Sequence, residues 1–103
     1  METFAKTRIE ITIEAPVLSR IRQKLDSLPV TGYSVLPIIE GKGHEGSWSV
    51  AGQIGEAGRM LMVVCIVDPS KAETVLEAIF PIVRGQIGIV AVSDVRVMRA
   101  DHF

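Results

Sequence analysis

Glycines gather in one stretch of this chain, from Gly41 to Gly58. Six of the nine glycines lie there, together with the only tryptophan, Trp48. The stretch has neither helical nor alternating apolar periodicity, which predicts a long loop, and such loops are commonly functional. Because glycine lets a backbone approach a ligand or partner closely, we interpret residues 41–58 as a flexible recognition loop. In it, Lys42 could bind a phosphate or small anion, or remain solvated. Trp48 could stack on a base or bind a partner protein, or pack against its own domain.

Two further glycines, Gly85 and Gly88, follow an apolar stretch with helical spacing. Consecutive backbone N–H groups in a turn form a concavity that binds phosphate. The same glycines could instead only end the helix. Arg96 is the favoured basic contact for an anion, whereas Arg59 and Arg84 lie at the ends of expected elements and could be ordinary surface charges.

Catalytic and metal-binding patterns are weak. His44 and His102 have no third ligand at a suitable spacing for a metal, and the serines have no evident histidine–acid partner. Cys65, the only cysteine, lies in an apolar run, so we expect a buried, inert thiol and no internal disulfide. The sequence therefore disfavours an enzyme and predicts no metal and no resident cofactor.

Composition indicates a single domain over residues 1–103. The chain is 48% apolar and carries a net charge of −1, which provides no general attraction to nucleic acid or to an anionic membrane. Its first residues lack the apolar core of a signal peptide, and no apolar run reaches membrane-spanning length. We expect a cytoplasmic protein without direct membrane insertion.

Apolar periodicity predicts the elements that must position these residues. Helical spacing indicates helices over 17–28 and from about residue 69 or 70 to before Gly85, with Pro81 expected to kink or loosen the second. Alternation or apolar runs indicate strands over 7–14, 33–40 (an edge or bulged strand because of Pro37), 59–67 (buried on both faces), 89–92 and 95–99.

This order predicts an α+β, ferredoxin-like βαββαβ sandwich, with the glycine-rich loop between its second and third strands and an extra C-terminal strand. Two helices would cover one face of the sheet. The other face would remain open with apolar residues on it, which favours burial in an oligomer.

Four segments, taken in this order, resemble the PII signal-transduction superfamily over nearly the whole chain. They are Gly32-Tyr-Ser34, Gly41-Lys-Gly43-His44, Gly85–Gly88 and Ser93-Asp-Val-Arg96. The resemblance implies a homotrimer that binds adenine nucleotides in clefts between subunits. It also implies that the long loop engages a target protein, and that the loop base and the turn after the second helix meet the terminal strand of a neighbouring subunit.

The resemblance implies three groups of nucleotide-binding residues. Around the base would lie Gly32, Ser34, Val63, Val64 and Cys65. At the loop base would lie Gly41, Lys42 and Gly43. Backbone N–H groups for phosphate would come from Gly85, Gln86, Ile87 and Gly88, and Arg96 would reach the phosphates.

Departures from the family pattern bear on the ligand. PII proteins usually continue the Ile-Gly pair with Asp-Gly-Lys, and that lysine contacts phosphate, but here Ile89 follows Gly88. We therefore expect ADP or AMP to be favoured over ATP. The position of the second terminal arginine is occupied by Met98, and Arg99 would point away from Arg96 unless the strand bulges. The loop is short and has no tyrosine, which excludes uridylylation there and is similar to PII-like proteins linked to bicarbonate uptake and carboxysomes.

The sequence thus predicts a non-enzymatic regulatory protein that senses adenine nucleotides, with bicarbonate as a second ligand near Lys42. Its target would be an unidentified protein, such as a bicarbonate transporter or a carboxysome-associated protein. Two alternatives stay open: a small dimeric ferredoxin-like enzyme with an apolar substrate, and a trimer that responds to divalent cations.

Overall fold

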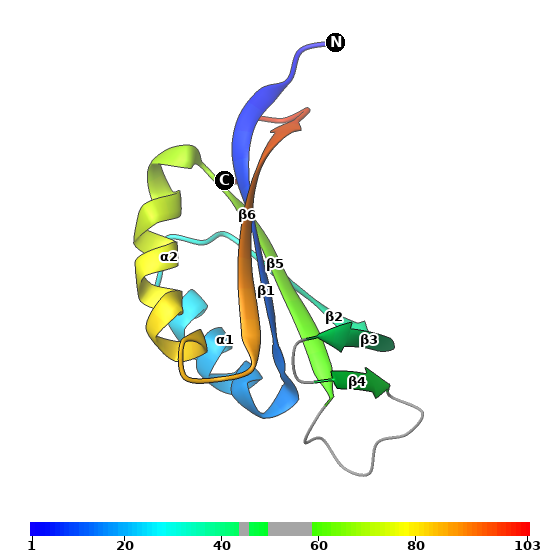
Figure 1. Ribbon diagram of the computed structural model, residues 1–103. Helices are drawn as coiled ribbons and strands as arrows, with labels where there is room; N and C mark the ends of the chain where they lie inside the picture. The colour runs from blue at the N-terminus through cyan, green and yellow to red at the C-terminus, as the bar shows by residue number, and fades with distance from the viewer. Residues whose placement is uncertain (44–45, 50–58) are drawn as a thin grey trace.

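A computed structural model of the chain describes residues 1–43, 46–49 and 59–103. Its elements are β1 (Phe4–Glu14), the short 3-10 helix η1 (Ala15–Val17), α1 (Leu18–Asp26), β2 (Ser34–Ile38), β3 (Glu40–Gly43), β4 (Gly46–Ser49), β5 (Met60–Val67), α2 (Pro69–Val83) and β6 (Gly88–Val97). The main sheet is antiparallel, in the order β2-β5-β1-β6. Both helices lie on the same side of it (Figure 1). The predicted ferredoxin-like α+β fold is confirmed.

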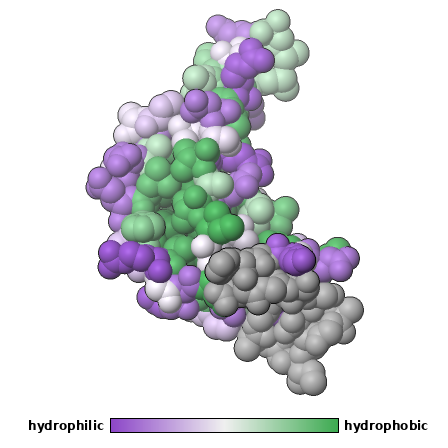
Figure 2. Space-filling view, in the orientation of Figure 1, coloured by the Kyte–Doolittle hydropathy of each residue, from purple (hydrophilic) through white to green (hydrophobic). Residues whose placement is uncertain are grey.

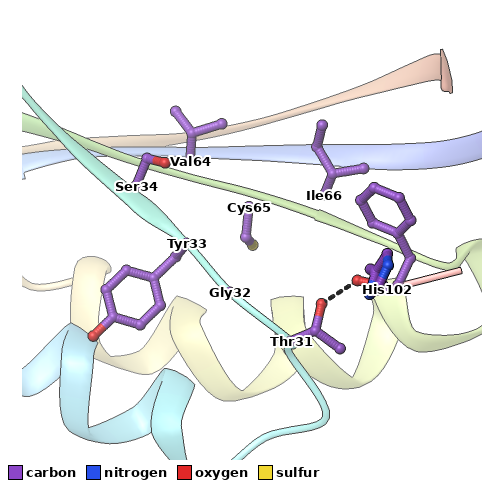
Figure 3. Close-up of a pocket in the computed structure, with 9 residues that line it drawn as sticks. Thr31, Gly32, Tyr33, Ser34, Val64, Cys65, Ile66 and His102 are labelled. Carbon is purple, nitrogen blue, oxygen red and sulfur yellow. Dashed lines mark hydrogen bonds between the residues drawn. The ribbon is translucent and has the colours of Figure 1, made fainter. Parts of the chain in front are cut away.

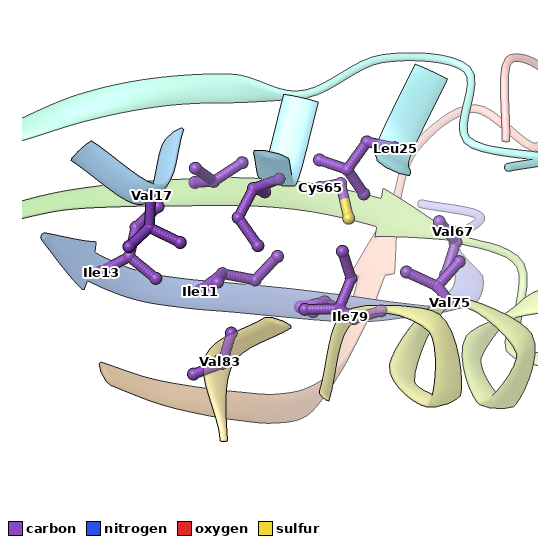
Figure 4. Packing of buried hydrophobic residues seen from close by; sticks show 12 residues of the cluster. Ile11, Ile13, Val17, Leu25, Cys65, Val67, Val75, Ile79 and Val83 are labelled. Carbon is purple, nitrogen blue, oxygen red and sulfur yellow. The ribbon is translucent and has the colours of Figure 1, made fainter. Parts of the chain in front are cut away.

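The core lies between the sheet and the two helices (Figure 4). Its residues are Ile9, Ile11 and Ile13 from β1, Val17 from η1, Ile21 and Leu25 from α1, Val63, Cys65 and Val67 from β5, and Val75, Ile79 and Val83 from α2. Alternate residues of a strand share a face, so the polar positions of β1 point to the opposite side of the sheet.

That opposite face is open and mixed in character. Residues that pair directly across strands share a face, which places Leu36, Met62, Thr12 and Ile89 in one row across the sheet. At its two ends, Leu36 and Ile89 are 45% and 66% exposed. The prediction that residues 59–67 are buried on both faces is wrong for the single chain, because Met62 and Val64 are only half-buried.

Two predicted breaks in the chain are absent. α2 continues as an α-helix through Pro81 and ends at Val83, so the proline does not loosen it. Val75, Ile79 and Val83 bury the same stripe on both sides of the proline, and this packing offsets a cost of about 3 kcal/mol. Likewise, the separate strands expected at 89–92 and 95–99 are joined into one strand, β6, because Ser93 and Asp94 keep their pairing with β1. β6 ends at Val97, two residues before the expected end.

Part of the glycine-rich segment is also more regular than expected. Glu40–Gly43 and Gly46–Ser49 pair as a small antiparallel hairpin, in which Gly41 lies opposite Trp48. The expectation of a structureless loop is therefore wrong for these residues. His44, Glu45 and residues 50–58 lie outside the described residues.

The edges of the sheet differ in their surroundings. β2 is an edge strand, as Pro37 predicted. At the other edge, an apolar patch extends over α2 and β6 (Figure 2), where a groove is lined by Leu76, Phe80, Pro81, Val90 and Val92 with Glu73 and Glu77. Neither helix in the described ranges is long and apolar enough to cross a bilayer.

Candidate functional site

A hollow of about 560 Å³ is open to solvent. It lies where the segment leading into β2 meets the C-terminal half of β5 and the last residues of the chain. It is lined by Thr31, Gly32, Tyr33, Ser34, Val64, Cys65, Ile66, His102 and Phe103 (Figure 3). Its volume lies within the range of about 300–1,000 Å³ that small-molecule sites occupy. The wall is mainly aliphatic and aromatic, and three of its residues, Thr31, Tyr33 and Ser34, carry a hydroxyl group, which suits a planar ring that carries hydrogen-bonding groups.

Four of the five residues expected around a base meet in this hollow: Gly32, Ser34, Val64 and Cys65. β2 and β5 bring them together, because Ser34 pairs directly with Val64. Val64 points to the side of β5 opposite Cys65 (Figure 3). Of the three β5 residues expected around the base, Val63, Val64 and Cys65, only Val64 therefore has its side chain on the open face.

Val63 belongs to the segment expected around the base, but its side chain does not line the hollow. Val63 is fully buried in the core, between the sheet and the helices. Because neighbouring residues of a strand face opposite sides, a segment of three consecutive residues cannot present all its side chains to one ligand. Cys65 likewise lies in the core, and burial raises the pKa of its thiol, which keeps it protonated and inert.

The hollow also contains residues that the sequence did not single out for it: Thr31, Tyr33, Ile66, His102 and Phe103. Tyr33 lies inside the segment Gly32–Ser34 of the resemblance, and Ile66 follows Cys65 directly, so adjacency was a usable signal for both. His102 and Phe103 arrive from the far end of the chain, and the hydroxyl of Thr31 donates a hydrogen bond to the carbonyl oxygen of His102. No local pattern could have indicated that contact.

The turn between α2 and β6 lies at the opposite end of the sheet, where Gly88 pairs with Ile13. The backbone N–H of Gln86 already donates to the carbonyl oxygen of Val83, over 2.9 Å. That hydrogen bond would have to break before this amide could bind phosphate. Gly85 is not in the left-handed conformation with which glycine commonly ends a helix.

The loop base is placed on β3. Gly41, Lys42 and Gly43 belong to this strand, and Lys42 is exposed opposite Ser47. Because its ammonium group is exposed at the edge of a hairpin, Lys42 is accessible to an anion from solvent.

The two arginines lie near the other end of the molecule. Arg96 is exposed on β6 and pairs with Ala5, eight residues along the strand from Gly88. At about 3.3 Å per residue this separates Arg96 from Gly88 by about 26 Å, so one chain cannot bring both to the same phosphate. Arg99 lies beyond the end of β6, where its guanidinium group contacts Asp101 at 3.1 Å and His102 at 2.8 Å. Because β6 ends at Val97, strand alternation does not extend to Arg99. The prediction that Arg99 points away from Arg96 therefore has no basis in strand geometry.

Within residues 1–43, 46–49 and 59–103, no group of three or more His, Cys, Asp or Glu side chains gathers in a way that could hold a metal ion.

Comparison with known proteins identifies the family to which this chain belongs. The family model of nitrogen regulatory protein P-II matches residues 6–102, so the chain belongs to the P-II family, whose members are signalling proteins. No curated protein matches the sequence.

Solved structures of PII-like proteins share the fold. CPII from Thiomonas intermedia K12, a nitrogen regulatory PII-like protein bound to ADP, AMP and bicarbonate, is 24% identical, with a TM-score of 0.88 over 99% of this chain and 96% of that one. Its apo form is 22% identical, with a TM-score of 0.72 over 93% and 95%. A candidate PII-like signalling protein from Thermus thermophilus is 18% identical, with a TM-score of 0.81 over 100% and 99%.

Proposed function

We propose that this member of the P-II family is a non-enzymatic sensor of adenine nucleotides that regulates a partner protein. The single observation that carries the proposal is the meeting of Gly32, Ser34 and Val64 in one hollow at the β2–β5 edge. These are residues that the resemblance assigns to the base, and they line a space of suitable size and polarity.

The phosphates would bind between subunits of a homotrimer. The distance of about 26 Å between Gly88 and Arg96 supports this arrangement, because a second copy of the chain is needed to bring an arginine to the glycine turn. Lys42 would approach the phosphates from β3. The exposed apolar residues of the open sheet face, Leu36 and Ile89 among them, would be buried in the assembly.

ADP and AMP are expected to bind more tightly than ATP. The position after Gly88, where a third phosphate would need cationic neutralisation, continues with Ile89 on the open face. Bicarbonate would be a second ligand near Lys42, in keeping with the ligands of CPII.

Regulation would pass through the segment 41–58. A ligand at the loop base would favour one arrangement of this segment over another, and Trp48 would then contact the partner. The differential affinity needed for such coupling is about 1–3 kcal/mol. The partner would be a bicarbonate transporter, contacted on its cytoplasmic side, or a carboxysome-associated protein.

Isothermal titration calorimetry with AMP, ADP and ATP, each with and without bicarbonate, tests the proposal. We expect micromolar dissociation constants for AMP and ADP, about −8 kcal/mol, and weaker binding of ATP. Light scattering on the same samples should give the mass of a trimer. An absence of binding heat and of thermal stabilisation with all three nucleotides would contradict the proposal.

A further inference from the structure

The chain does not simply run off the end of β6. Its last four residues, Ala100–Phe103, turn back across the end of the sheet, and we call them the strap. They contact β1 through Lys6, whose ammonium group donates to the carbonyl oxygen of Ala100 at 3.3 Å and lies 5.3 Å from the centre of the Phe103 ring. The strap therefore begins at one edge strand and crosses its neighbour.

Two further contacts carry the strap to the opposite edge. Lys71, in the first turn of α2, donates to the carbonyl oxygen of Phe103 at 2.9 Å. Thr31, ahead of β2, donates to that of His102. Segments distant in sequence thus hold three of the four strap residues. The strap crosses from β6 to the hollow beside β2, where His102 and Phe103 join the lining.

Lys6 is the centre of these contacts. It is 7% exposed, and its charge is compensated by an ion pair with Asp68, the residue before α2. A cation within about 6 Å of an aromatic ring attracts that ring, more strongly when it is shielded from water. The nearly buried ammonium group is thus placed to hold both the backbone and the ring of the strap.

The backbone of the strap requires such support. His102 adopts a φ angle of 79°, in the left-handed region that side chains with a β-carbon rarely occupy. A conformation of this kind persists only where surrounding contacts impose it. Thr31 contacts the backbone carbonyl oxygen of His102, and Arg99 contacts its imidazole ring.

We propose that the strap, latched by Lys6, is the closing wall of the hollow and that Phe103 provides an aromatic surface for the base of the ligand. The inference rests on the proposed binding of adenine nucleotides. Phe103 and His102 line the same hollow as Ser34 and Val64, so a ligand seated there meets the strap. Phe103 is thus a ligand-contacting residue, whereas Lys6 is a positioning residue that acts through the strap.

Calorimetry with AMP tests the contact. Phe103→Ala should weaken AMP binding about tenfold, the loss expected when a base loses an aromatic neighbour. Phe103→Leu, which keeps an apolar side chain but no ring, should also weaken it, whereas Phe103→Tyr should bind within about twofold of the wild type. Unchanged or tighter binding by Phe103→Ala would overturn the proposal, since it would mean that the strap does not contact the ligand or only obstructs it.

NMR relaxation of the free protein tests the latch independently of any ligand. In Lys6→Met, the backbone order parameters of residues 98–103 should be lower than in the wild type, while those of the β1 core around Ile11 stay high. Lys24→Met, at an exposed lysine of α1, serves as the matched control and should leave the strap unchanged. Thr31→Val, at an exposed position, should release the strap without touching the core if Lys6→Met fails to fold.

The outcomes separate the two ideas. If the wild type binds none of AMP, ADP and ATP, the proposed function fails, and the role of Phe103 as a wall for the base is overturned with it. A strap that is ordered in the wild type and mobile in Lys6→Met would still support the latch. Order parameters of the strap that are the same in both proteins would overturn the latch even if AMP binds.

Discussion

Gly88 lies against Thr12 so closely that a β-carbon at Gly88 would be 2.8 Å from the carbonyl oxygen of Thr12. It would also lie 3.0 Å from Cγ1 of Val83. The glycine is therefore required for the approach of β6 to β1, whatever it does for a ligand. Gly85, three residues earlier, has open space at the same place. The two glycines of one motif thus serve different purposes in the fold.

Gly88→Ala should destabilise the protein by about 1–3 kcal/mol, because neither the backbone oxygen of Thr12 nor the packed Val83 can move away without strain. Gly85→Ala is the matched control. It should be neutral or stabilising by up to about 1 kcal/mol, since its backbone is not left-handed and nothing opposes a methyl group. Urea unfolding of both variants measures the difference. Equal losses would show that the close contact at Gly88 is not what requires glycine.

A bulky side chain at Ser34 should block the hollow. Ser34 is exposed, so Ser34→Phe should keep the stability of the wild type, while its ring occupies the space beside Val64. We expect AMP binding to fall at least about tenfold, or about 1.4 kcal/mol. Ser19→Phe, at an exposed serine of α1, is the control and should bind normally. Normal binding by Ser34→Phe would place the base elsewhere.

The open sheet face should carry the trimer contacts. Ile89→Glu puts a charge on an apolar side chain that is 66% exposed in the single chain, and burying that charge in an interface costs several kcal/mol. Light scattering should then report a smaller assembly. Phe80→Glu changes an apolar residue that is 54% exposed, but on the helix side, and should leave the assembly intact. The reverse result would move the interface to the groove between α2 and β6.

Acid should weaken the pair that anchors the strap. A hydrogen bond from Lys6 lowers the pKa of Asp68, and the charges of Lys6 and Lys71 act in the same direction, against the opposing effect of partial burial. A folded-state pKa below the unfolded value contributes stability above that unfolded value, about 3.9. The contribution is lost as the pH falls through the lower, folded-state value.

The measurement for this pair compares wild type with Asp68→Asn across pH. The urea midpoint of the wild type should exceed that of Asp68→Asn at pH 7 and pH 5 by the same amount. The difference should shrink only below about pH 4. A difference that shrinks already between pH 7 and pH 5 would contradict the lowered pKa.

The sequence by itself determined the architecture. Alternation over β1, helical spacing in α1 and α2, and the apolar run of β5 are local properties, and they specified the elements, the core face and the ferredoxin-like order. They failed where tertiary packing outweighed local preference. α2 continues through Pro81 because its buried stripe does, and β6 passes Ser93 because β1 pairs with it.

The tertiary structure decided which of the candidate residues can act together. Val63 and Val64 are neighbours in sequence, yet one is core and the other faces the hollow, because strand geometry alternates sides. Gly88 and Arg96 share a strand but are too far apart for one phosphate, and Thr31 contacts His102 across 71 positions of the chain. Such contacts depend on how the chain crosses the sheet, and periodicity within a segment carries no information about that path.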